Sequence, residues 1–345
     1  MKRRPITRMV MAALLSLWGI CLIFPLQAQA GKKDIIFSTA GPMYPAFAEQ
    51  IGINLYINAL LGLTQTHPLL KGKYNLKIYD KGMLYGNQSE ALEAVANGAL
   101  QMTYSGPHFL EELDPAWKLG ELPGMFENWA HFRRTMATPA WQELQDRMAK
   151  EKGVTILGWL FDTGTWYLYT KTGPIKSMAD IKGQKIRFAG GEAFAKALKA
   201  LNTTPIALPY TEVVTALQTN MIEGLLTDFT GGVGYFELTR HTKYAVLVPF
   251  GNQPICMVVN TKWWQGLDPK VRKALSIPFE QIDATRFYSG FEKKGIKTWS
   301  ENPKLTAVRF DKAETAKWQS RMREAFKEMF SRIDAKYLKA VESAR

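Results

Sequence analysis

Cysteine and histidine are scarce in this chain of 345 residues, and each scarcity excludes a kind of site. Of the two cysteines, Cys21 falls in the N-terminal apolar segment and Cys256 in an apolar, strand-like run, so no disulfide is predicted. The four histidines are scattered. His108 with Glu111 and Glu112 lacks the paired histidines of a zinc-protease helix, and a metal site is the weaker interpretation. We predict no metal ion and no cofactor.

The motifs of common enzyme classes are also missing. No G-x-S-x-G elbow and no P-loop occurs, and the glycine-rich run at residues 231–234 does not satisfy G-x-G-x-x-G. The formal net charge is +13, but the lysines are mixed with acids along helix faces and form no basic stripe, so no nucleic-acid partner is predicted. No catalytic residue is predicted.

The N-terminus has the pattern of a cleavable signal peptide over residues 1–30. A positive segment precedes an apolar run over residues 9–26, and Ala28-Gln29-Ala30 supplies small residues for cleavage. An uncleaved membrane anchor is the alternative, because about 18 apolar residues nearly span a bilayer. We expect an exported protein whose mature chain begins at Gly31.

From Asp34 onward, strands and helices alternate, which predicts an α/β protein with mainly parallel sheets. Ser89 is a candidate cap for a helix that Gly98 stops. Residues 154–161 and 166–170 are predicted as separate strands, and residues 312–341 as one helix with a core-facing apolar stripe.

Arg187 is the outstanding candidate for ligand binding. It ends a short apolar strand that opens onto Ala189-Gly190-Gly191 and then a helix. A side chain at the carboxyl end of such a strand faces the crevice where α/β sheets bind ligands, and a guanidinium matches a carboxylate bidentately. A structural salt bridge is the alternative role. Gly190 would let the backbone approach a ligand closely.

Aromatic residues near predicted strand ends would suit the walls of an apolar pocket. Each of them alone is more often a core residue. The candidates kept as ligand contacts are Tyr104, Trp166, Tyr167, Tyr210 and Phe250.

The segments 177–187 (SMADIKGQKIR) and 200–218 (ALNTTPIALPYTEVVTALQ) resemble the solute-binding proteins of tripartite ATP-independent periplasmic (TRAP) transporters, of the DctP type. Residues 82–102, 122–132 and 258–275 agree in order and spacing, so the resemblance covers essentially the whole mature chain.

The resemblance implies two α/β lobes with mixed sheets, crossing strands and a long helix spanning both lobes, with the ligand clamped between them. By this comparison lobe I takes residues 31–163 and 253–292, and lobe II takes residues 164–252 and 293–345.

The resemblance also assigns residues. Arg187 falls on the family's arginine that pairs with the ligand carboxylate, and Tyr210 on an aromatic position that lines the pocket. Thr227 stands where the family usually has a ligand-contacting asparagine. Trp166 or Tyr167 occupies the place of a second arginine found in some relatives. Losing that cation favours a monocarboxylate with an apolar or aromatic body over a dicarboxylate or a sugar acid.

The expected function is therefore a periplasmic receptor that delivers a small organic acid to the small and large membrane subunits of a TRAP transporter. A ligand sensor for a signalling kinase is one alternative, and an exported enzyme is a weaker one.

Overall fold

The computed structural model describes residues 32–41, 48–122, 124–229, 238–282 and 291–345. The chain divides into two units, Met1–Lys32 and Lys33–Arg345. The predicted signal peptide lies outside the described residues, and everything below concerns the second unit. None of the described helices has both the length and the hydropathy that a membrane-spanning segment needs.

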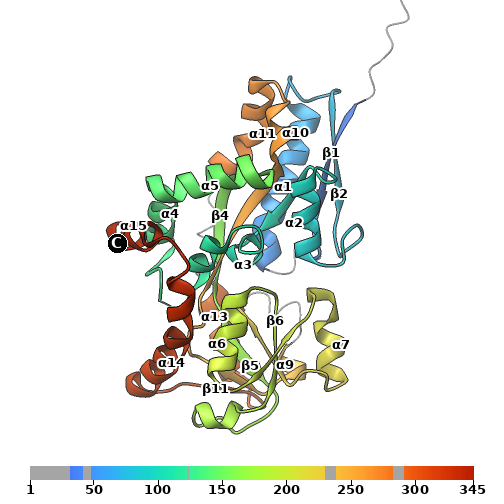
Figure 1. The fold of residues 1–345 in the computed structure, drawn as a ribbon. Coiled ribbons are helices and arrows are strands. Elements are labelled where there is room, and N and C mark those ends of the chain that lie inside the picture. Colours follow the sequence, from blue (N-terminus) through green and yellow to red (C-terminus); the bar gives the residue numbers. More distant parts are fainter. Residues whose placement is uncertain (1–31, 42–47, 123, 230–237, 283–290) are drawn as a thin grey trace, which may run out of the picture. The chain divides into compact units, whose positions relative to one another are not determined.

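Two mixed β-sheets organise this unit (Figure 1). Sheet A has the order β2 (Tyr74–Tyr79), β1 (Lys33–Ser38), β3 (Met102–Ser105), β10 (Asn252–Asn260) and β4 (Val154–Thr165). Sheet B has the order β11 (Thr306–Val308), β9 (Tyr244–Val246), β5 (Tyr167–Thr170), β8 (Gly224–Thr227), β6 (Lys185–Phe188) and β7 (Thr204–Ala207). In sheet A, β10 runs antiparallel to both of its neighbours, and in sheet B, β5 does the same. The remaining pairs are parallel.

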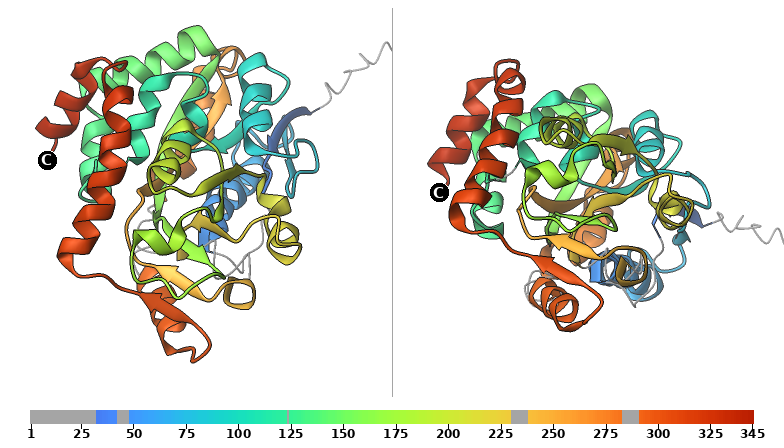
Figure 2. Two further views of the ribbon diagram at one scale, coloured as in Figure 1. Left: turned by 60° about the horizontal axis from the view of Figure 1, so that its bottom comes forward. Right: turned by 90° about the horizontal axis from the view of Figure 1, so that it is seen from below.

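Helices cover both sheets (Figures 1 and 2). The described α-helices are α1 (Ala48–Thr66), α2 (Gln88–Asn97), α3 (Pro107–Leu110), α4 (Trp129–Met136), α5 (Pro139–Lys152), α6 (Glu192–Ala200), α7 (Val213–Gln218), α9 (Leu238–His241), α10 (Thr261–Gln265), α11 (Pro269–Gln281), α13 (Phe291–Glu301), α14 (Lys312–Phe330) and α15 (Ala335–Ser343). Three short 3-10 helices are η1 (Pro115–Glu121), η2 (Met178–Ile181) and η3 (Tyr210–Glu212).

The chain passes repeatedly between the sheets. Strand β4 of sheet A leads into β5 of sheet B, and β9 of sheet B leads back into β10 of sheet A. Helix α11 packs on α1 and β4, whereas α13 packs on β11. Residues 283–290 between these two helices lie outside the described residues, and the predicted long helix spanning both lobes stays a prediction. The exact lobe boundaries stay a prediction.

Alternation along the strands distributes side chains between the cores. In β5, Leu168 joins a core that extends through both sheets, whereas Tyr167 and Tyr169 join a second core beneath α7 and α13. In β8, Leu226 likewise joins the core shared by both sheets, and Leu225 joins the second core. Because one core is shared by both sheets, the two layers are joined by apolar packing as well as by the crossing strands.

Strand β10 shows why a continuous apolar run forms a strand buried on both faces. Its Cys256 is fully buried, and burial raises the pKa of the thiol, as befits the inert cysteine that the sequence predicts.

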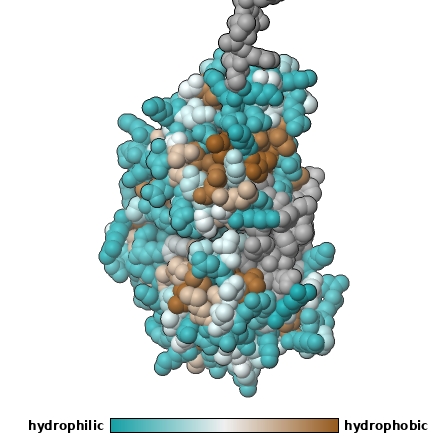
Figure 3. Space-filling view, turned by 90° about the vertical axis from the view of Figure 1, so that its right-hand side faces the viewer, coloured by the Kyte–Doolittle hydropathy of each residue, from teal (hydrophilic) through white to brown (hydrophobic). Residues whose placement is uncertain are grey.

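Figure 3 shows a mainly hydrophilic surface with an upper and a lower apolar patch separated by more polar residues.

Two predicted boundaries were wrong. Strand β4 continues through Asp162 and Thr163, because its pairing with β10 persists across register shifts there. The predicted helix over residues 312–341 is broken into α14 and α15, where Asp334 accepts a hydrogen bond from the Lys336 backbone and begins a new helix. The apolar stripe is confirmed, because Trp318, Met322 and Tyr337 are fully or almost fully buried.

Gly251 provides a test of the crossing at the start of β10. Its φ is +137°, and a Cβ there would lie 2.0 Å from the Glu121 carbonyl oxygen. We expect Gly251→Ala to lower the free energy of unfolding by about 2 kcal/mol or more. Alanine is strained at this positive φ, and its Cβ would clash with a backbone oxygen that cannot move aside as a flexible side chain could. Denaturant unfolding measures this. Gly62→Ala in α1, where nothing lies within 4 Å of a new Cβ, should instead be neutral or stabilising; equal effects would contradict the prediction.

Candidate functional site

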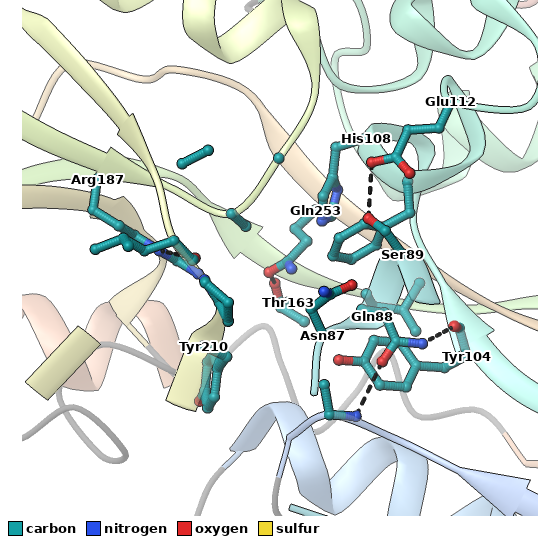
Figure 4. Close-up of a pocket in the computed structure, with 18 of the residues that line it drawn as sticks. Asn87, Gln88, Ser89, Tyr104, His108, Glu112, Thr163, Arg187, Tyr210 and Gln253 are labelled. Atoms are coloured by element: carbon teal, nitrogen blue, oxygen red, sulfur yellow. Dashed lines mark hydrogen bonds between the residues drawn. The ribbon is translucent and has the colours of Figure 1, made fainter. Parts of the chain in front are cut away.

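A cavity of about 300 Å³ lies where the ends of strands from both sheets meet, and it is of a size for a small organic molecule (Figure 4). One part of its lining follows β6 and β7 of sheet B, and the other comes from α2, α3 and the ends of sheet A strands. The lining residues are Ala40, Ile53, Asn87, Gln88, Ser89, Tyr104, His108, Phe109, Glu112, Thr163, Arg187, Ala189, Gly190, Ala207, Leu208, Pro209, Tyr210, Gln253 and Ile255.

Arg187 carries the positive charge of this lining. It stands in β6 between β7 and β8, with only 2% of its surface exposed. Its Nε donates a hydrogen bond of 3.0 Å to the Leu208 carbonyl oxygen, which orients the guanidinium plane. Figure 4 shows Arg187 and Tyr210 on the same side of the cavity. A buried guanidinium held in this way is suited to a carboxylate, because the desolvated charge gains most from a bidentate partner.

The backbone after β6 turns sharply beside the cavity. Gly191 has φ +89° and precedes α6, and Gly190 lines the cavity itself. A Cβ on Gly190 would contact Phe109, and one on Gly191 would press on His108 and Glu111. Glycine at position 191 therefore lets the backbone before α6 lie close to α3, whereas position 190 has room for a Cβ.

Polar side chains line the part of the cavity that follows sheet A. The Asp162 carboxylate accepts three hydrogen bonds, from the backbone N–H groups of Gly164 and Gln253 and from the side-chain amide of Asn252. These contacts hold β4 against β10 where their register shifts, and Thr163 and Gln253 face the cavity from this irregular stretch. Such bulges often redirect side chains beside binding sites.

Carboxylates also join the two sheets behind the cavity. Glu111, next to α3, accepts a hydrogen bond from the backbone N–H of Glu192, the first residue of α6. Lys118 forms an ion pair with the Glu192 side chain, and Lys118 together with Lys196 lowers the pKa of Glu192 to about 2. Burial raises the pKa of Glu111 to about 7.

The histidine and acids that weakly suggested a metal site are engaged elsewhere. His108 Nδ1 lies 2.7 Å from the Glu121 carboxylate, and both residues are buried. Burial raises the pKa of Glu121. Glu111 is bonded to α6, and the Glu112 carboxylate accepts a hydrogen bond from Ser89.

Four of the eight predicted ligand contacts line the cavity: Arg187, Tyr210, Gly190 and Tyr104. The structure places the other four outside its lining. Trp166 stacks on Phe194 with ring centroids 4.7 Å apart, and Phe250 is fully buried in the shared core.

The remaining two predicted contacts are Tyr167, which packs in the second core, and Thr227, which lies in the neighbouring strand β8. The Tyr167 hydroxyl donates to Glu292, and Thr227 is buried opposite Tyr167 in the β5–β8 pair. Ligand contact by any of the eight residues stays a prediction.

Several lining residues were missed from the sequence, among them Asn87, Gln88, Thr163 and Gln253. The predicted helix cap Ser89 was wrong: Asn87 caps α2 by accepting from the Glu90 backbone, and the Ser89 hydroxyl points to Glu112 instead. The amide-rich loop before α2 was the available signal. Gln253 offered none, because its position depends on the register between two strands distant in sequence.

The family model for bacterial extracellular solute-binding proteins, family 7 (DctP), matches residues 63–333, and the chain belongs to this family. The resemblance to TRAP solute-binding proteins predicted from the sequence is confirmed.

Among individual relatives, the chain is 28% identical over 207 residues to the 2,3-diketo-L-gulonate-binding periplasmic protein YiaO of Escherichia coli K12. This match covers 59% of the chain and 61% of YiaO, about three fifths of that relative's length. It is 24% identical to the C4-dicarboxylate-binding periplasmic protein DctP of Rhodobacter capsulatus, covering 79% of the chain and 81% of the relative.

Solved structures confirm the two-lobed α/β fold with mixed sheets. A TRAP periplasmic solute-binding protein from Shewanella oneidensis with bound succinate matches with a TM-score of 0.80 at 19% identity, covering 91% of this chain and 99% of that one. The sugar acid binding protein DctPAm from Advenella mimigardefordensis, in complex with galactonate, matches with a TM-score of 0.79 at 18% identity and the same coverage.

The buried Glu111 predicts a pH dependence of stability. Its folded pKa of about 7 lies above the ordinary value of 4.5 for a glutamate, so between these pH values the folded state binds the proton more strongly than the unfolded state. The free energy of unfolding should therefore fall as pH rises from about 4.5 to about 7. In Glu111→Gln, which keeps an oxygen acceptor for the Glu192 backbone, this fall should be smaller by about 1–3 kcal/mol.

Denaturant unfolding at pH 5 and pH 7.5 measures the difference. Some pH dependence should remain in the variant, because burial also raises the pKa of Asp162, to about 6. Glu93→Gln, at an exposed position of α2, is the matched control. A pH dependence in Glu111→Gln as steep as in the wild type would contradict the assignment.

Proposed function

We propose that this chain is the extracytoplasmic solute-binding receptor of a TRAP-type secondary transporter. It binds a small organic acid between two lobes, with the carboxylate on Arg187, and delivers the acid to the small and large membrane subunits. It acts in the periplasm, reached through a signal peptide at residues 1–30, and it catalyses no reaction.

The buried guanidinium of Arg187 at the cavity is the observation that carries this proposal. With 2% of its surface exposed, this guanidinium is desolvated, and a carboxylate in the cavity would meet it as a charge-assisted, bidentate partner. Family membership supports the same role, and the ligands in the matched structures, succinate and galactonate, are both carboxylates.

The charge pattern of the lining favours a monocarboxylate with an apolar or aromatic body. Arg187 is the sole Arg or Lys among the described lining residues, so a second carboxylate would find no fixed cation there. Glu112, in the sheet A part of the lining, would repel one. Phe109, Ile53 and Ile255 supply apolar surface for the body of the ligand.

Removal of Arg187 should abolish carboxylate binding. We expect Arg187→Ala to weaken binding of any bound carboxylate by about 100-fold or more, because one partner of a desolvated charge pair is lost. Arg187→Lys keeps the charge but not the planar fork and should fall in between. Calorimetry and thermal shift with acetate, pentanoate, 4-phenylbutanoate, succinate and galacturonate measure the effect.

Lys185→Ala, which removes an exposed cation from the same strand, is the matched control and should bind like the wild type. Carboxylates that bind Arg187→Ala as well as the wild type, or a complete lack of carboxylate binding, would refute the proposed function. Tighter binding of succinate or galacturonate than of pentanoate and 4-phenylbutanoate would refute only the monocarboxylate class.

A further inference from the structure

Two amides in the cavity lining share an unusual hydrogen-bonding state. In both Asn87 and Gln253 the side-chain oxygen accepts a hydrogen bond from the protein. Within the described part of the chain, neither NH₂ group donates one. Both residues line the cavity and are half-buried, so these N–H groups are available to a ligand there.

For Asn87, the helix cap determines which end of the amide remains. Its backbone is extended, with φ −138° and ψ 167°, and its Oδ1 accepts from the Glu90 backbone N–H at 2.9 Å. The cap requires an oxygen acceptor, so the amide cannot turn over without losing it. Its two Nδ2 hydrogens are left for a partner in the cavity.

For Gln253, the crossing strands determine the orientation. The Thr163 hydroxyl, almost fully buried, donates to Gln253 Oε1 at 2.6 Å, which is its shorter contact, whereas the Asp228 carboxylate lies 3.2 Å away. The Gln253 backbone N–H donates to Asp162, so the main chain is held as well. Its two Nε2 hydrogens are likewise left over.

Gln88 shows the contrast within the same lining. Its Oε1 accepts from the Ala40 backbone, and its Nε2 donates to Thr103 Oγ1 at 2.8 Å and to the Tyr104 carbonyl at 2.7 Å. Gln88 therefore lines the cavity, but its amide oxygen and NH₂ group already have hydrogen-bond partners within the protein. In Figure 4, Asn87 and Gln253 lie apart from Arg187 and Tyr210, toward the other side of the pocket as drawn.

We propose that Asn87 and Gln253 determine specificity by donating hydrogen bonds to an uncharged oxygen acceptor, such as a ketone, on the part of the ligand remote from its carboxylate. This inference rests on the proposed function, which places that carboxylate on Arg187. A donor pair selects ligands with an acceptor, since a ligand without one leaves desolvated N–H groups unpaired. An uncharged acceptor fits better than a second carboxylate because Glu112 lies in the same part of the lining.

Matched acids that differ by one carbonyl oxygen test the inference. We would measure dissociation constants by calorimetry for 4-oxopentanoate against pentanoate, and for 4-oxo-4-phenylbutanoate against 4-phenylbutanoate. The wild type should bind at least one oxo acid about threefold to tenfold more tightly than its matched acid, the value of one hydrogen bond.

The variants are chosen to keep the protein's own hydrogen bonds. Asn87→Asp retains the cap oxygen and Gln253→Glu retains the acceptor for Thr163, but each loses its N–H donors. Both variants add a negative charge that weakens the binding of every anionic ligand. The readout is therefore the ratio of the two dissociation constants within a matched pair of acids, in which that effect largely cancels. Gln253→Met removes the donors without adding charge. In each variant the preference for the oxo acid should fall toward one.

Asn302→Asp is the control, because this asparagine lies outside the cavity lining and its side chain also accepts a backbone N–H, that of Lys304. It should keep the wild-type ratio. Arg187-dependent binding with no oxo preference in the wild type, or a preference that survives in all three site variants, would overturn the inference and leave the proposed function standing. If no acid binds the wild type, the proposed function fails and the inference falls with it.

Discussion

Burial of the Arg187 guanidinium is the main physical constraint on the sheet B side of the site. Removing such a charge from water costs several kcal/mol, which the surrounding structure must offset. The hydrogen bond to Leu208 does part of this, and it is available because β6 and β7 run parallel and bring residues 187 and 208 together. The position of the cation is thus a property of sheet B as a whole.

On the opposite side, the pairing of β4 with β10 positions residues that face Arg187 across the cavity. These strands come from distant parts of the sequence and lie at the two ends of the segment that builds most of sheet B. Asp162 holds them together where their register shifts, and the same irregularity directs Thr163 and Gln253 into the cavity. The connection between the sheets and part of the cavity lining therefore depend on the same strand pairing.

The two sides of the cavity are chemically unequal. Sheet B contributes a fixed positive charge, and the elements of sheet A contribute amides, hydroxyls and an exposed carboxylate. This division suits a ligand with one charged end and one neutral end. The contact of Glu111 with the first residue of α6 joins the two sides close to the cavity.

Local sequence was enough to predict the α/β class, the apolar strands, the stripe of the final helices and the candidate role of Arg187, because these depend on hydrophobic period and on an isolated cation at a strand end. The family resemblance, carried by residues 177–218, extended that prediction to the whole fold. Only the tertiary structure decided which neighbours of Arg187 share its cavity. Trp166 and Phe250 turned into the core, whereas Asn87 and Gln253 line the cavity. The Asn87 cap is a local contact with Glu90, but the position of Gln253 depends on the register of β4 with β10, which joins residues far apart in sequence.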